Sequence, residues 1–170
     1  MPQLPDKLLD GERRYEVQRG GRLVHQDDFW RHGRGQIVGY PIVDLRRRGI
    51  GVRSYLRALE AALIAALRSV GVGAFARPGL TGVWTASGKL AAIGIAVRRG
   101  ITRHGFALNV STDLTYFDGI VPCGLAGVQM TSIEQLGKEA TVEEVADRCS
   151  AHFAEVFDRR LDSVSAGREK

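Results

Sequence analysis

Residues 53–70 place the strongest constraint on the fold, because their apolar side chains recur at helical spacing. The apolar positions are Tyr55, Leu56, Leu59, Ala62, Leu63, Ala66, Leu67 and Val70. This stripe predicts an amphipathic helix from Arg53 to Val70, which must bury one face against another layer of structure. Gly71 and Gly73 follow at once and predict where the helix ends.

Strand-type segments lie on both sides of this helix. Residues 37–45 are apolar and β-branched, and Pro41 within them favours an edge strand or a bulge. Residues 83–85 and 89–97 predict two strands joined by a turn, and residues 106–110 alternate as a further short strand. The sequence therefore predicts an α/β or α+β fold, a single domain with a mixed β-sheet and helices packed on it.

Two capping-box patterns predict helices in the last third of the chain. Thr131-x-x-Glu134 predicts a short helix that ends at Gly137, and Thr141-x-x-Glu144 predicts a longer helix through about Phe157. The side chains expected to point inward on the longer helix are Val142, Val145, Cys149, Phe153 and Val156.

Length and composition suit one globular domain. The chain has 170 residues, of which 25% are charged and 44% are apolar, values typical of globular proteins. We expect residues 1–18 to be poorly ordered, residues 19–160 to form the domain, and residues 161–170 to be a polar tail. No apolar leader or membrane-length apolar run is visible, so we expect a soluble, cytoplasmic protein with reduced thiols.

The chain is basic, with a formal charge of +5. Arginines cluster at residues 13–14, 46–48, 98–99 and 159–160. A basic surface attracts acidic partners, and the residues alone leave both nucleic acid and an acidic carrier protein open. The simpler interpretation is that these arginines are solvated side chains beside turns and helix ends.

Cys123 and Lys89 are the candidate reactive residues. Cys123 lies in Pro122-Cys123-Gly124, where proline fixes the local backbone and glycine removes a side chain beside the thiol. Only a thiolate is nucleophilic, and a nearby ammonium lowers the pKa of a thiol from its usual value of about 8.5. From the residues alone, Cys123 is equally well a structural thiol beside a turn, and Lys89 a polar residue entering a strand. Cys149, on the apolar stripe, is expected to be a core residue.

Six separated motifs carry a resemblance to a known family, from about Arg19 to the C-terminal helix. In order, they are Arg19-Gly20-Gly21, His32-Gly33-x-Gly35-Gln36, Gly82-Val83-Trp84, Lys89 to Gly94, His104-Gly105-x-Ala107-Leu108-Asn109-Val110 and Pro122-Cys123-Gly124. This series resembles the octanoyltransferases of lipoate biosynthesis, also called lipoyl(octanoyl) transferases. The resemblance implies the fold of the biotin and lipoate protein ligases.

The resemblance also implies an acyltransferase activity. An octanoyl group passes from octanoyl-acyl carrier protein to Cys123 and then to a lysine of a lipoyl-accepting domain, with Lys89 as the catalytic partner of the thiol. The acceptors it implies are lipoyl domains of 2-oxoacid dehydrogenase complexes or the glycine cleavage H protein. It implies no cofactor, no nucleic acid and no membrane, and we assign no metal.

The resemblance carries over a set of substrate-binding positions. They are Arg19, Gly20, Gly21, His32, Gly33, Ala92, Ile93, Gly94, Gly105, Phe106 and Ala107. Small and apolar residues suit an alkyl chain. The sequence departs from the family in two places: residues 22–31 form a longer loop without the family's threonine, and the family's longer N-terminal region is absent.

Two other functions remain open. An ATP-dependent lipoate or biotin ligase would share the fold, although adenylate-forming ligation needs no thiol. A non-catalytic, impaired member that binds carrier or lipoyl domains is the second alternative, because both departures touch one wall of the expected acyl pocket.

Overall fold

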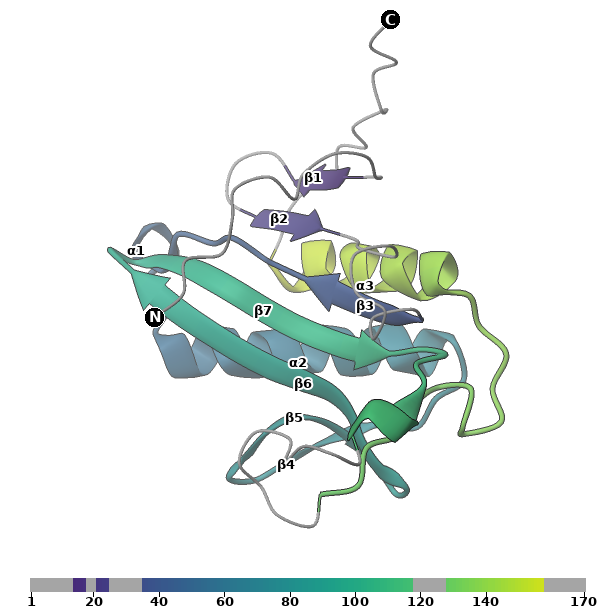
Figure 1. Ribbon diagram of the computed structural model, residues 1–170. Coiled ribbons are helices and arrows are strands. Elements are labelled where there is room, and N and C mark those ends of the chain that lie inside the picture. The colour runs from purple at the N-terminus through teal and green to yellow at the C-terminus, as the bar shows by residue number, and fades with distance from the viewer. Residues whose placement is uncertain (1–13, 18–20, 25–34, 118–127, 158–170) are drawn as a thin grey trace, which may run out of the picture.

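A five-stranded antiparallel sheet is the centre of the computed structural model (Figure 1), which describes residues 14–17, 21–24, 35–117 and 128–157. The strand order is β3-β7-β6-β5-β4. The strands are β3 (Gln36–Gly39), β4 (Phe75–Arg77), β5 (Leu80–Thr85), β6 (Gly88–Arg98) and β7 (Ile101–Asn109). A parallel bridge between Lys89 and Met130 adds the mixed character expected from the sequence.

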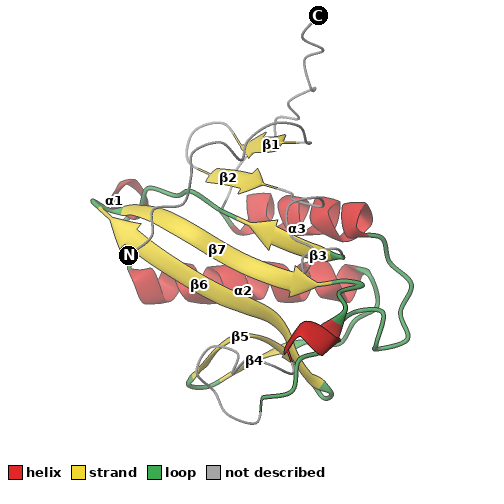
Figure 2. Cartoon of the chain, viewed as in Figure 1, coloured by secondary structure: helices red, strands yellow, loops and turns green. Residues whose placement is uncertain are grey.

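Two helices cover one face of the sheet. They are α2 (Val52–Ser69) and α3 (Val142–Val156), which pack against each other on the same side in Figures 1 and 2. The apolar stripe of α2 is buried as predicted, so that Leu59, Leu63 and Leu67 are almost completely inaccessible to solvent. The sheet contributes Val83, Ile93, Phe106 and Leu108 to the same core. The opposite face of the sheet is covered by neither α2 nor α3 (Figure 1).

The capping box before α3 is confirmed. The Thr141 hydroxyl accepts a hydrogen bond from the Glu144 amide at 3.1 Å, and the helix follows directly. Val145, Cys149 and Phe153 point inward as expected. Val156 was expected inward but is 42% exposed, because the last turn of the helix carries Phe153 and Phe157 to the core instead.

The helix predicted after Thr131 is wrong. Residues 133–137 form a hydrogen-bonded turn, in which the Ser132 hydroxyl accepts from the Gln135 amide at 3.1 Å. The Leu136 amide donates to Ser132 and the Lys138 amide to Ile133. The capping box itself does not form, since the Glu134 amide donates to the Val110 carbonyl and not to the Thr131 hydroxyl. The chain makes this one turn and ends it at Gly137, where φ is +71°.

Pro41 ends the first strand of the central sheet earlier than predicted. The run of residues 37–45 was expected to be a strand, but β3 stops at Gly39. The chain rejoins β7 at Val43, whose carbonyl accepts from the Thr102 amide at 3.0 Å. β3 is an edge strand, as the proline indicated, because proline lacks the amide that a central strand must donate.

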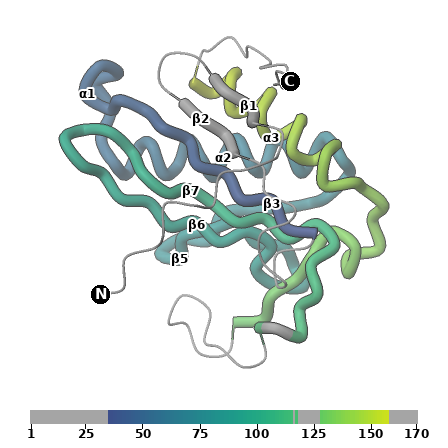
Figure 3. The backbone as a smooth tube through the Cα atoms, turned by 45° about the horizontal axis from the view of Figure 1, so that its top comes forward, coloured from purple at the N-terminus to yellow at the C-terminus, as the bar shows by residue number. Residues whose placement is uncertain are grey.

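The short helix α1 (Leu45–Arg48) follows this edge, and the η1 turn (Leu114–Phe117) follows β7. The tube view in Figure 3 shows η1 below the sheet, at the end where β7 stops. A separate hairpin pairs β1 (Arg14–Val17) with β2 (Gly21–Val24). It forms where the sequence predicted poor order up to residue 18. It also corrects the loop predicted at residues 22–31, because residues 22–24 are part of β2. The domain limits at residues 19 and 160 stay predictions.

Candidate active site

A β-bulge decides which face of the sheet Lys89 occupies. Val83 pairs with Ala91, but the next residue, Trp84, pairs with Lys89, so that β6 has one extra residue at this point. Leu90 and Ala91 both lie in the core beside Val83. Because side chains otherwise alternate between the faces, the extra residue puts Lys89 on the face away from the helices, together with Ala92 and Gly94.

Lys89 is nearly completely buried on this face, with 1% of its surface exposed. Its ammonium lies 5.4 Å from the centre of the Trp84 ring, within the range of a cation–π interaction. The end of its aliphatic stem lies against Gly82, where a Cβ atom would come within 2.7 Å of Lys89 Cε. Burial of a lysine is rare unless the charge is satisfied, so this position differs from an ordinary strand lysine.

β7 ends at Asn109, before it reaches Lys89, and the segment at residues 129–131 pairs with Lys89 there instead. The Lys89 amide donates to the Gln129 carbonyl at 2.8 Å, and the Thr131 amide donates to the Lys89 carbonyl at 3.0 Å. Asn109, at the end of β7, fixes this segment further by donating to the Thr131 carbonyl at 3.0 Å. Gln36 in turn donates to Asn109 at 2.8 Å. Two polar side chains therefore tie β3, β7 and the segment together.

Cys123 lies outside the described residues, in the stretch 118–127. The chain enters this stretch from η1 and leaves it at Val128, directly before the segment that is bonded to Lys89. A cavity of about 280 Å³ lies between the η1 turn, which precedes this stretch, and the segment from Val128, which follows it. It is lined by Leu114, Thr115, Phe117, Val128, Gln129, Met130 and Gln135.

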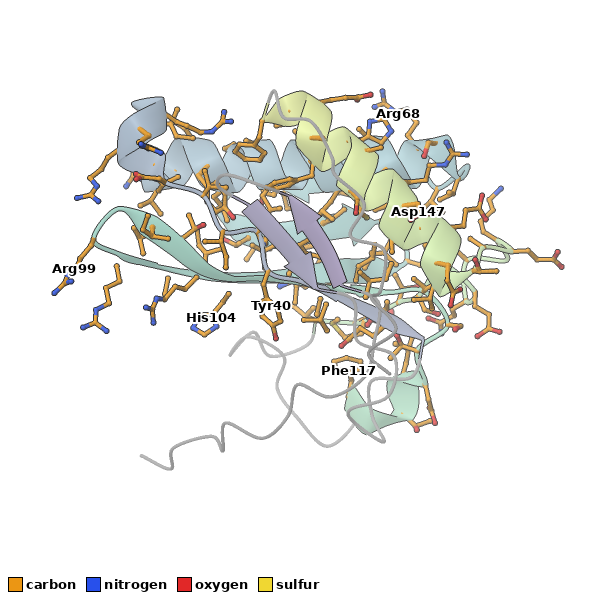
Figure 4. All side chains as sticks on the ribbon, turned by 90° about the horizontal axis from the view of Figure 1, so that it is seen from above. Tyr40, Arg68, Arg99, His104, Phe117 and Asp147 are labelled. Carbon is orange, nitrogen blue, oxygen red and sulfur yellow. The ribbon has the colours of Figure 1, made fainter. Side chains whose placement is uncertain are left out.

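The helix-free face of the sheet carries small side chains next to Lys89. Ala92 of β6 pairs with Ala107 of β7, and Ala107 pairs with Val38 of β3, so that the three side chains form a row. A Cβ on Gly94 would meet no described atom within 4 Å. Tyr40 and His104 also point away from the helices (Figure 4). Next to Lys89, this face therefore presents a floor of small residues.

The structure places the predicted substrate-binding residues of β6 and β7 in different surroundings. Ala92, Gly94 and Ala107 lie on the helix-free face. Ile93 and Phe106 instead belong to the core beneath the helices, so their side chains do not line that floor. Gly105 is crossed closely by the backbone of Gly39, which leaves no room for a side chain there.

The remaining predicted positions lie near the N-terminus. Arg19, Gly20, His32 and Gly33 fall outside the described residues, and Gly21 begins β2.

Cys149 is the core residue that its place on the stripe predicted. It is 2% exposed on α3, and desolvation by burial raises the pKa of its thiol from 9.0 to about 12. A thiol in this state is not a nucleophile near neutral pH.

The described residues show neither a metal site nor a membrane-spanning helix. The described part of the chain holds no cluster of three or more histidine, cysteine, aspartate or glutamate side chains arranged for a metal ion. None of its helices has both the length and the apolar character needed to cross a membrane.

Sequence reasoning missed four residues that shape this site. Gly82, Trp84 and Asn109 stood in the quoted motifs without an assigned role. Glu60, buried under β5, carried a signal that was available: it is a charged residue within the apolar stripe of α2.

Comparison with known proteins identifies the family. A family model described as the lipoyl protein ligase A/B catalytic domain matches residues 12–154. The chain belongs to this family. The resemblance seen in the six motifs is thereby confirmed.

Two relatives of this chain are named octanoyltransferases. A protein named octanoyltransferase from Solibacter usitatus is 49% identical over 144 residues, covering 85% of this chain and 62% of that protein. An octanoyltransferase from Pelobacter propionicus is 47% identical over 146 residues, covering 85% of this chain and 70% of that protein. The chain therefore spans between 62% and 70% of the length of these two relatives.

Solved structures confirm the predicted fold. A bipartite lipoate protein ligase from Thermoplasma acidophilum matches with a TM-score of 0.62 at 19% identity, covering 86% of this chain and 59% of that one. The biotin protein ligase from Aquifex aeolicus matches with a TM-score of 0.58 at 12% identity, covering 74% and 53%. The chain thus has the fold shared by lipoate and biotin protein ligases.

Proposed function

We propose that this chain transfers an octanoyl group from octanoyl-acyl carrier protein to a lysine of a lipoyl-accepting domain. Cys123 carries the octanoyl group as a thioester, and Lys89 moves the protons. The acceptors are lipoyl domains of 2-oxoacid dehydrogenase complexes or the glycine cleavage H protein. The reaction takes place in the cytoplasm, where thiols stay reduced.

The observation that carries this proposal is the position of Lys89. Its ammonium is buried over Trp84, and its backbone is hydrogen-bonded to the segment that begins two residues after the stretch containing Cys123. Gln129 is six residues from Cys123, which limits their separation to about 20 Å at full extension. The octanoyltransferase names of the curated relatives support the same chemistry.

The first step forms the acyl-enzyme. The Cys123 thiolate attacks the carbonyl carbon of the donor thioester, and the bond from that carbon to the carrier's sulfur breaks. The Lys89 ammonium gives a proton to the departing sulfur and becomes a neutral amine. An ammonium suits this role because, unlike a guanidinium, it can release its proton.

The second step forms the amide. The neutral amine of the acceptor lysine attacks the carbonyl carbon of octanoyl-Cys123. Lys89 takes the proton that the attacking nitrogen loses, and the Cys123 thiolate leaves. Both groups thus return to their starting states, and no nucleotide is consumed because the acyl group arrives already activated as a thioester.

The acyl chain lies on the floor formed by Ala92, Gly94 and Ala107. These residues border Lys89 on the same face, so a chain laid across them brings its carbonyl end toward the ammonium. Ile93 and Phe106 support this floor from the core side and do not contact the chain. The N-terminal positions Arg19 to Gly21, with His32 and Gly33, complete the site in this proposal.

The test is the intact mass of the protein after incubation with octanoyl-acyl carrier protein. We expect one added octanoyl group, mapped to Cys123 by peptide analysis and lost on addition of a lipoyl domain. Cys123→Ala should show no added mass, whereas Cys149→Ala should be labelled like the wild type. Octanoyl on Cys149, or full turnover by Cys123→Ala, contradicts the proposal.

The alternatives give different results in the same assay. An ATP-dependent ligase hydrolyses ATP when given free octanoic or lipoic acid and acquires no thioester from the carrier. A non-catalytic member binds the carrier or the lipoyl domain and shows neither change.

A further inference from the structure

Glu60 buries a carboxylate within the apolar face of α2. Only 1% of the residue is exposed. One carboxylate oxygen accepts from the Gly82 amide at 3.1 Å, and the other pairs with the Arg57 guanidinium at 2.6 Å. Burying a carboxylate is costly, and an apolar residue in such a place is often neutral or stabilising. Stability alone therefore gives a weak reason for a glutamate here.

Gly82, the residue that Glu60 holds, lies in direct contact with Lys89. Its φ angle is +129°, which side chains rarely allow. A Cβ there would approach the Ala91 carbonyl oxygen to 2.6 Å and Lys89 Cε to 2.7 Å. The backbone of Gly82 therefore lies directly against the lysine stem.

Trp84 lies against the ammonium end of the same side chain. It pairs with Lys89 across β5 and β6, and the ammonium lies over its ring. Lysine has four rotatable side-chain bonds, so it keeps one conformation only where neighbours block the others. Glu60 fixes Gly82, and Gly82 together with Trp84 fixes the stem of Lys89.

We propose that Glu60 is a positioning residue for Lys89, acting through the Gly82 amide to hold β5 against the lysine stem. This inference rests on the proposed function only for the role of Lys89 in transfer. The arrangement of Glu60, Gly82 and Lys89 is measurable without any turnover. Arg57 balances the charge of the carboxylate, so the contact with Gly82 is what Glu60 supplies toward the site.

The first measurement is the NMR signal of the lysine ε-methylene group. The chain has four lysines, so lysine-selective labelling gives a simple spectrum, in which Lys89→Met identifies the Lys89 signal by its loss. Protons over an indole ring are shifted upfield by its ring current. We expect an upfield Lys89 signal in the wild type and in Glu60→Gln, whose amide oxygen still accepts from Gly82. In Glu60→Leu we expect the signal to move toward those of the other lysines.

The second measurement is the rate of octanoyl transfer by the folded protein. We expect Glu60→Leu to lower kcat about tenfold or more, since displacement of a catalytic group by about 1 Å can cost 100-fold. The KM for octanoyl-acyl carrier protein should stay unchanged, and Glu60→Gln should restore most of the rate. Gly82→Ala is an independent variant, because it keeps Glu60 and displaces the lysine stem directly; it should shift the same signal.

Thr102→Val is the matched control for a general loss of stability. Thr102 is fully buried, accepts from the Val43 amide at 2.7 Å and donates to the Pro41 carbonyl at 2.8 Å. It pairs with Val97, which lies about 26 Å along β6 from Lys89 at about 3.3 Å per residue. The variant should lower the melting temperature but leave both the Lys89 signal and kcat as in the wild type.

An unchanged Lys89 signal in Glu60→Leu and Gly82→Ala overturns the inference. So does a displaced signal with an unchanged kcat, or a kcat loss of the same size in Thr102→Val. Full transfer by Lys89→Met would refute the proposed role of Lys89 instead, and the NMR signals would still report whether Glu60 holds the side chain.

Discussion

The buried thiol of Cys149 should make the free energy of unfolding fall as the pH rises above about 9. The substitution Cys149→Ala should remove this part of the pH dependence. Burial raises the pKa of its thiol from 9.0 to about 12. A thiol with a raised pKa keeps its proton in the folded state after the unfolded state has lost it. Its contribution to stability is therefore fully present below about pH 9 and is lost as the pH rises from about 9 to about 12.

The size of the effect follows from these two values. At pH 10 the unfolded thiol is about 90% ionised and the folded thiol is almost fully protonated, which lowers the free energy of unfolding by about 1.4 kcal/mol relative to neutral pH. At pH 8 the loss is below about 0.1 kcal/mol. Cys149→Ala has no such group, although at neutral pH it loses about 1 kcal/mol of packing.

The assay is urea denaturation of the wild type and Cys149→Ala at pH 7 and pH 10 with reductant present. Taking the difference between the two proteins cancels every other titrating group, including Cys123. We expect the wild type to be about 1 kcal/mol more stable at pH 7 and no more stable than the variant at pH 10. A difference that stays the same at both pH values would refute the reasoning, because it would mean that the thiol ionises equally in both states.

Three further predictions concern the site. Lys89→Met should slow alkylation of Cys123 at neutral pH by raising the thiol pKa; an unchanged pH profile of the alkylation rate would show that the two side chains are not coupled. Asn109→Leu removes hydrogen bonds to Gln36 and Thr131 and should lower the free energy of unfolding by about 2–3 kcal/mol in urea titrations; a loss below about 0.5 kcal/mol would count against the tie. Replacing residues 25–31, which follow β2, with the family's short threonine-containing segment should raise the transfer rate with almost no change in melting temperature, since loop closure entropy varies slowly with length; a fall in rate would show that the longer segment is an adapted part of the site.

The sequence predicted those elements whose signals are local. The stripe of α2 and the Thr141 cap depend on residues within a few positions of each other, and both were correct within one or two residues. The helix prediction after Thr131 was wrong: the Glu134 amide, which a capping box would bond to the Thr131 hydroxyl, donates instead to the Val110 carbonyl, more than twenty residues earlier in the chain. No pattern around Thr131 reports that competition.

The site was predictable only in part for the same reason. Lys89 and Ala92 were recognised from their motif, but a strict alternation would place them on opposite faces of β6. The bulge that unites them depends on how β5 pairs with β6, which neighbouring residues do not specify. Likewise, Ile93 and Phe106 stand within motif segments, but their direction follows from the sheet, and it takes them to the core.

The bulge at Leu90 and Ala91 also sets a rule for how this region can change during evolution. A substitution between Lys89 and Ala92 changes only the local packing of side chains. Loss of a single residue there would restore regular alternation and turn the Lys89 side chain toward the core. Gain of one residue shifts the strand in the opposite sense with the same result. We therefore expect this point of β6 to tolerate changes in the identity of its residues but not in their number.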